Sequence, residues 1–496
     1  MLRVVCRVKI NRQVLKSRLG GIKSPLVYCI IMPIFAVLKN NGMTDKGRDS
    51  IDFGNDGIWP LFRKLFFPTL VGMIFNSALT IIDGIFVGHG VGADGIAAVN
   101  IVAPIFLLST GIGLLFGIGS SVVASIHLAK DNAKAARIIM TQAVIFGLLI
   151  ISVIVALSVG FTDTLLGILG CSPRLEANAT DYLLWLLPGL LFLYMQCVGM
   201  MLIRLDGSPR YAMWVQVIGA VVNIGLDWYM IFPLGMGVKG AAVATSIACI
   251  VAGVMVLAYF IWFSRTLKFY RLKLSKTSLK LSLRNCGYMV RIGFATFLTE
   301  LAMSVMMLSG NYMFMEMLRE EGVAAFAIAC YLFPVVFSIS NAVAQSAQPI
   351  ISFNYGAQNG TRVNKALRIS VYTAIVCGIV IALLVWLGAN AITAMFLSPS
   401  DMAYDFAVKG LPLFGLCAIA FALNIAFIGY YQSIENAGTA IAYTFLRGIV
   451  FLVPAFLLLP RLIGVSGLWL AIPSAETMTL GVIVAVYFIR RRLVER

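Results

Sequence analysis

The sequence has little charge and almost no histidine. Asp, Glu, Lys and Arg make up 12% of its 496 residues, against about a quarter in ordinary globular proteins. It holds two histidines and no CxxC pair that would complete a zinc site with them. Several of its nine cysteines, among them Cys197, Cys249 and Cys330, lie within apolar runs. These shortages argue against disulfides, metal centres and a soluble domain.

Apolar residues take the place of charge and make up 60% of the chain. Runs of about twenty such residues recur from near Leu65 to the end, and each is long enough to cross a hydrocarbon layer of about 30 Å as a helix. We therefore predict an all-α polytopic membrane protein with twelve transmembrane helices. The expected spans are 61–86, 96–122, 138–160, 181–203, 211–232, 239–263, 287–314, 323–347, 369–390, 406–431, 439–459 and 465–489.

The net charge of +17 is explained by membrane topology rather than by a nucleic-acid partner. When the N-terminus is placed in the cytoplasm, most Lys and Arg fall on the inner side, with a dense group between Arg265 and Arg291. Inner loops of membrane proteins carry this excess of basic residues. The pattern predicts a multi-pass protein of a bacterial inner membrane with both termini cytoplasmic.

The chain repeats itself. Gly92–Ala98, followed by Pro104, is similar to Gly322–Ala327, followed by Pro334. Each half has six expected spans, so both halves enter the membrane in the same direction and form parallel repeats related by a pseudo-twofold axis. The predicted division is an N-terminal extension (1–57, disordered or a wrongly assigned start), an N-lobe (58–263), a basic cytoplasmic linker (264–286) and a C-lobe (287–496).

Acidic residues inside the spans need a function or a partner, because a charge at the bilayer centre costs at least ~2.5–3.5 kcal/mol. Asp83 shares a helix face with Asn76 and Thr80, at spacings i, i+4 and i+7, and Asp227 shares one with Asn223. Glu300 lies in the seventh span. Carboxylate, amide and hydroxyl oxygens suit Na⁺, while the same carboxylates could instead carry protons. Interhelical hydrogen bonding alone is a further possibility.

Other residues in the spans are weaker candidates for contact with a substrate. Thioethers and aromatic faces suit lipophilic cations, although packing between helices accounts for the same residues. Arg447, inside a span, is expected to reach the membrane surface or to pair with a carboxylate. The substrate candidates are Asn76, Gln216, Tyr194, Met303, Met307, Gln345 and Asn424.

Four blocks in chain order resemble the multidrug and toxic compound extrusion (MATE) family, in its bacterial MepA-like branch. They are Asn76–Gly88, Arg204–Pro209, Asn223–Asp227 with Gly237–Thr245, and Gln348–Gly356. The resemblance implies twelve helices in two six-helix lobes, and antiport of organic cations against Na⁺ or H⁺.

The resemblance also implies a cation site at Asp83, Asn223, Asp227 and Thr245, of which Thr245 comes from the resemblance alone. Glu300 matches a seventh-span Glu that one branch uses. The tenth-span Asp of that branch is absent here, where the sequence has Asn424.

We expect a secondary active multidrug efflux transporter that works by alternating access, is monomeric, and needs no cofactor beyond its coupling ion. Its partners would be small cationic, amphipathic molecules and membrane lipids. The first alternative is a flippase for lipid-linked precursors, which would need extra spans and several Arg facing a cavity. The second is an intramembrane enzyme, for which neither histidine has a catalytic partner. A channel is disfavoured.

Overall fold

The computed structural model of the protein describes residues 51–272 and 275–494, and these fold into helices and turns. Residues 1–50 of the predicted N-terminal extension lie outside the described residues. The helices of the first repeat are α3 (Ile58–Val91), α4 (Ala93–Ala129), α5 (Ala133–Gly160), α6 (Thr162–Ile168), α7 (Glu176–Leu205), α8 (Pro209–Ile231), α9 (Gly237–Ala258) and η2 (Tyr259–Phe263).

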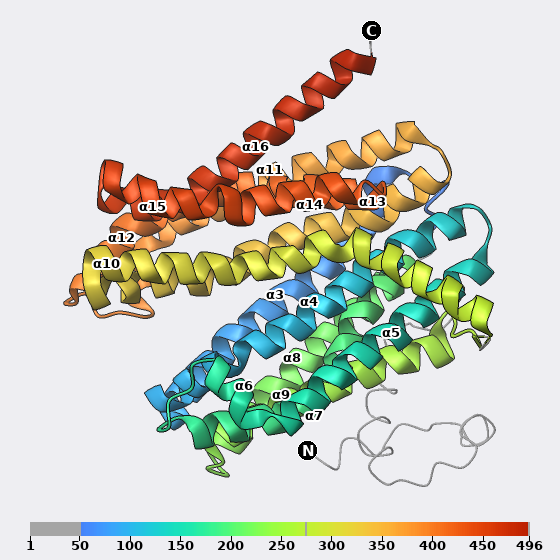
Figure 1. The fold of residues 1–496 in the computed structure, drawn as a ribbon. Coiled ribbons are helices and arrows are strands. Elements are labelled where there is room, and N and C mark those ends of the chain that lie inside the picture. Colours follow the sequence, from blue (N-terminus) through green and yellow to red (C-terminus); the bar gives the residue numbers. More distant parts are fainter. Residues whose placement is uncertain (1–50, 273–274, 495–496) are drawn as a thin grey trace, which may run out of the picture. The chain divides into compact units, whose positions relative to one another are not determined.

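The second repeat begins with one long helix and continues with shorter ones. Its helices are α10 (Lys276–Gly356), α11 (Gly360–Ala394), α12 (Met402–Gly415), α13 (Cys417–Ser433), α14 (Ala437–Phe445), η3 (Leu446–Val450), α15 (Leu452–Ile463) and α16 (Val465–Val494). Figure 1 shows helices α3 to α9 gathered in one group and the later helices in another.

The predicted twelve-span, all-α fold is confirmed. Among the described residues, 11 helical segments are long and apolar enough to cross a membrane. One of them, α10, has 81 residues and contains two expected spans, 287–314 and 323–347, on either side of a kink at Arg319 (φ 59°, ψ −149°). The helices extend beyond the apolar runs because their polar end turns remain helical outside the hydrocarbon layer.

The turns between helices repeat along with the helices. Residues in the left-handed region of backbone space are uncommon outside glycine, yet four such positions of the first half each have a counterpart at nearly the same separation in the second half. The pairs are Gly92 and Arg319, Asp131 and Gln358, Gly207 and Glu435, and Gly237 and Gly464. The same hairpin geometry is therefore built twice, in agreement with the predicted duplication.

Asparagine side chains then start the helices that follow three of these turns. Asn132, Asn359 and Asn436 accept hydrogen bonds from backbone N–H groups three residues later, at 3.0, 3.2 and 3.4 Å. These bonds satisfy N–H groups that have no partner within the helix.

The two repeats meet where backbone lies directly on backbone. A Cβ atom on Gly119 of α4 would lie 2.2 Å from the carbonyl oxygen of Met289, and one on Gly293 of α10 would lie 1.9 Å from that of Leu115. Only glycine leaves room for this approach. Helix α4 of the first repeat is thus seated against the first half of α10.

We predict that Gly293→Val forces α4 and α10 apart and destabilises the protein by about 1–3 kcal/mol, the usual cost of overpacking. Thermal unfolding of the detergent-solubilised protein measures this. Gly287→Val is the matched control, because a Cβ on Gly287 of the same helix has no atom within 4 Å. Equal midpoints for the two variants would contradict the close contact.

Candidate functional site

The structure brings together four of the predicted cation-site residues. Asp83 of α3 and Asp227 of α8 are neighbours, and their carboxyl groups interact with each other. Asn223, one turn from Asp227 on α8, donates from Nδ2 to Oγ1 of Thr245 on α9 at 3.4 Å. Asp227 and Asn223 are 0% and 3% exposed. Three helices of the first repeat therefore supply two carboxylates, an amide and a hydroxyl to one cluster, in which Asp83 and Thr245 are half-buried.

The carboxylates of this cluster have unused oxygens. Oδ1 of Asp83 and both oxygens of Asp227 are buried and have no hydrogen-bond donor among the described residues. Buried polar atoms without a partner are rare because each costs desolvation energy. Two carboxylates facing each other also repel unless a proton or a cation lies between them. The cluster thus has the chemistry to take up positive charge.

Tyr182 of α7 is a neighbour of the cluster that the sequence did not single out. It is buried and interacts electrostatically with both Asp83 and Asp227. The sequence around Tyr182 does not indicate a site, because an aromatic residue in an apolar run usually packs between helices.

Glu300 lies elsewhere. It is 5% exposed, and its Cβ lies beside Gly111 of α4. Glu300 is therefore a separate buried carboxylate at the contact between α10 and the first repeat.

The remaining polar residues predicted on α3 and α8 differ in their burial. Gln216 is buried against Gly72, with Oε1 unpartnered among the described residues. Asn76 and Thr80 have exposed side chains, and the Thr80 hydroxyl donates to the Asn76 carbonyl at 3.2 Å. That bond satisfies Thr80 within its own helix, so of the predicted stripe only Asp83 joins the cluster.

The aromatic and methionine residues predicted to contact a substrate lie in different surroundings. Tyr194 is 0% exposed, and its hydroxyl donates to the Ala143 carbonyl at 2.6 Å, which ties α7 to α5. Met303 packs against the core of the second repeat, and Met307 is 42% exposed.

Gln345 borders a small polar cavity of about 30 Å³. A cavity of this size holds one or two water molecules. It has far too little room for a drug-sized molecule in this conformation. The polar residues around it are Thr296, Thr299, Asn341, Gln345, Gln348 and Gln432.

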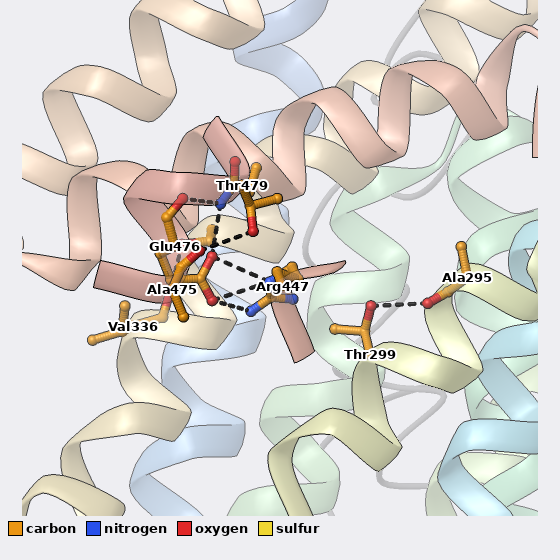
Figure 2. Close-up of polar contacts among 9 residues, drawn as sticks. Ala295, Thr299, Val336, Arg447, Ala475, Glu476 and Thr479 are labelled. Atoms are coloured by element: carbon orange, nitrogen blue, oxygen red, sulfur yellow. Dashed lines mark hydrogen bonds and ion pairs between the residues drawn. The ribbon is translucent and has the colours of Figure 1, made fainter. Parts of the chain in front are cut away.

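Asn424 belongs to a buried ionic cluster in the second repeat, of which Figure 2 shows Arg447 and Glu476. Arg447 of η3 pairs with Glu476 of α16 at 2.8 Å, and both side chains are 5% exposed. Asn424 of α13 donates to Oε2 of Glu476 at 2.7 Å. Of the two arrangements expected for Arg447, the structure shows the pairing with a carboxylate rather than the reach to the membrane surface. Glu476, although it is the one acid of the last span, was overlooked.

Comparison with known proteins places the chain in a family. The sequence profile of the MatE family matches residues 68–229 and 295–457, which covers both repeats. The chain belongs to the MatE family. Family membership also makes it a transporter rather than an enzyme.

Curated relatives and solved structures agree with this assignment. The chain is 22% identical to the multidrug export protein MepA of Staphylococcus aureus over 88% of its own length and 95% of MepA. It is 26% identical to MepA of Staphylococcus saprophyticus over 86% and 93%. Its fold is similar to that of a multidrug resistance MATE family transporter described as outward-facing (TM-score 0.82, 21% identity, 89% and 97% covered). A mutant of the Vibrio cholerae MATE transporter VcmN matches at TM-score 0.80 and 20% identity, over 88% and 98%.

In this MATE fold a clamp from the second repeat holds the segment that leads into α3. Arg362 Nη2 donates to the carbonyl oxygens of Phe53 and Asp56 at 3.0 and 2.7 Å. Asn354 Nδ2 donates to the same Phe53 oxygen at 3.0 Å, and Arg362 Nε donates to Oδ1 of Asn354 at 2.8 Å. The rings of Phe53 and Phe353 pack 5.7 Å apart.

Buried polar side chains join the repeats close to this clamp. Arg204 Nη1 donates to Oε1 of Gln345 at 2.7 Å, and the Ser121 hydroxyl donates to Oε1 of Gln348 at 3.1 Å. These residues lie near the basic turns. The MATE repeats are thus held together at the basic end, and a further hydrogen bond, from the Ser77 hydroxyl to Ser338 Oγ at 2.7 Å, joins them midway along α3.

We expect Arg362→Ala to release the clamped segment. A hydrogen bond from a charged group contributes about 1.5–3 kcal/mol, so loss of the lower figure would raise local opening about tenfold. Hydrogen–deuterium exchange over residues 51–57 measures the opening. Lys365→Ala removes an exposed charge from the same helix and should leave the exchange unchanged. If both variants exchange like the original chain, Arg362 does not hold the segment.

Proposed function

We propose that the protein is a secondary active exporter of small cationic, amphipathic compounds, driven by a gradient of Na⁺ or H⁺. The observation that carries the proposal is the pair Asp83 and Asp227, which face each other inside the membrane with carboxylate oxygens that lack donors. The relatives that bear the name multidrug export protein support the direction and the class of substrate.

Either coupling ion fits the cluster chemically. Na⁺ prefers hard oxygen ligands, and the carboxylates of Asp83 and Asp227 would provide most of the negative charge. Because Asn223 uses Nδ2 on Thr245, its carbonyl oxygen stays available as a further ligand. A proton shared by the two carboxyl groups would relieve the same repulsion.

Transport then proceeds by alternating access between the two lobes. The contacts of Arg362, Arg204 and Ser121 hold the basic end of the lobes together, which is the cytoplasmic end if both termini lie inside. On this proposal, these contacts keep the cytoplasmic side closed in this conformation. Export follows if the coupling ion and the drug favour opposite conformations, since each shifts the equilibrium by its difference in affinity for the two.

The flippase alternative has no comparable support. Its substrates carry phosphates, which arginines facing a cavity would bind. Arg447, the one arginine expected within a span, is buried and paired with Glu476.

We predict that Asp83→Asn and Asp227→Asn each reduce gradient-driven efflux to the level of protein-free liposomes. Either change removes one of the two carboxylates that would bind the coupling ion. The assay is transport of an organic cation in proteoliposomes. Asp94→Asn is the control, since Asp94 pairs with Arg174 at the exposed start of α4. Normal export by both Asn variants would rule out the cluster as the coupling site.

The same vesicles identify the coupling ion. A Na⁺ gradient and a pH gradient are imposed separately, and the one that drives uphill flux of the cation is the coupling gradient. Flux that only follows the substrate's own gradient under both conditions would indicate a channel and contradict the proposal.

A further inference from the structure

The ionic cluster of the second repeat lies between helices that correspond to α8 and α9. Helices α8 and α14 begin at Pro209 and Ala437, and helices α9 and α16 begin at Gly237 and Val465. The two separations along the chain are equal. Because η3 directly continues α14, Arg447 lies on the counterpart of α8, and Glu476 lies on the counterpart of α9.

The four residues of the first cluster are not themselves repeated. At that same separation, Asp83 corresponds to Asn311, Asn223 to Phe451, Asp227 to Ala455 and Thr245 to Pro473. Arg447 and Glu476 instead occupy the paired helices roughly one to two turns away from those positions. Each lobe therefore has buried ionisable groups between equivalent helices, with different residues.

The charges of the two clusters differ. In the N-lobe, Asp83 and Asp227 have no basic partner among the described residues. In the C-lobe, Oε1 of Glu476 accepts from Arg447 Nε and Nη2 at 3.0 and 2.8 Å, and Oε2 accepts from Asn424. Both oxygens of Glu476 are thus occupied, and the pair is neutral.

Several contacts fix the guanidinium in place. Its Cζ lies 4.4 Å from the centre of the Phe421 ring, a cation–π contact. The next residue, Gly448, touches Ala302 of α10 so closely that a Cβ would lie 2.4 Å from the alanine side chain. The helix takes the wider π form over Leu446–Val450, a distortion often found at functional sites. Figure 2 shows Arg447 directed at Glu476.

Stability alone does not explain such a pair. Two ions buried together lose hydration that their attraction often fails to repay, and apolar residues of the same size commonly replace them without loss. A carboxylate that stays ionised inside a membrane nevertheless needs a positive partner. Arg447 provides it permanently, whereas the Asp83–Asp227 cluster has to take its positive charge from outside the chain.

We propose that Arg447 is a tethered cation that fills a latent ion site at Glu476, so that the coupling ion binds in the N-lobe alone. This inference rests on the proposed function for its consequence in transport. The latent site is of the carboxylate and amide type, formed by Glu476 and Asn424, and would take Na⁺ or a proton once the guanidinium is removed.

The first test measures the chemical reactivity of Glu476 and does not require transport. Dicyclohexylcarbodiimide modifies protonated carboxyl groups in apolar surroundings, and peptide mass spectrometry locates the adduct. Glu476 should stay unmodified in the original chain and become modified in Arg447→Met. Arg447→Lys, which keeps a tethered charge, should remain unmodified. Modification of Glu476 in the original chain would overturn the proposal, and so would its absence in Arg447→Met.

The second test measures how steeply efflux depends on the coupling ion. The Hill coefficient of Arg447→Met should exceed that of the original chain by about one, because a second site now binds the ion. The double variant Arg447→Met/Glu476→Gln has neither charge and should return to the original value. An unchanged coefficient in Arg447→Met, or a folded but inactive double variant, would refute the tethered-cation role.

The coupling role of Asp83 and Asp227 and the tethered-cation role of Arg447 can be refuted independently of each other. Asp227→Asn tests the coupling cluster and leaves the modification of Glu476 unaffected. If Arg447→Met does not fold, the double variant decides, since it leaves no unpaired charge: transport with the original Hill coefficient supports the proposal, and loss of transport in folded protein overturns it.

Discussion

The organisation of this protein depends on how it accommodates a few charges in a hydrocarbon environment. Water cannot solvate a carboxylate there, so an ionised carboxylate needs a partner from the bundle or takes up a proton or a cation. Asp83 and Asp227 come from different helices and face each other, while Glu476 is held by Arg447 and Asn424. In the first arrangement carboxylate oxygens lack a donor, whereas in the second both oxygens of Glu476 are occupied and only Arg447 Nη1 and Asn424 Oδ1 have no partner among the described residues.

Much of the fold could be predicted because lipid imposes simple rules. The apolar runs gave the twelve spans, and the merging of two spans into α10 changed only how they are joined at Arg319. Helical spacing placed Asp227 and Asn223 on one face, and the family resemblance assigned them to one site with Asp83 and Thr245. The structure then brought these residues together.

Other contacts could not be predicted, for definite reasons. Spacing along a helix shows which residues share a face, but not which neighbour that face meets, so the Arg447–Glu476 pair and the isolation of Glu300 from Asp83 required coordinates. The clamp of Arg362 binds the backbone carbonyls of Phe53 and Asp56, and a carbonyl carries no side-chain signature. Asn76 satisfied the expected spacing yet remained outside the cluster.

The glycine contact between α4 and α10 has a mechanical consequence. At Gly119 and Gly293 the two helices touch through their backbones, so a side chain at either position would push them apart. The polar contacts of Arg204 and Arg362 with the other repeat break in discrete steps. Any relative movement of the repeats therefore either keeps α4 and the first half of α10 together or separates them at this contact.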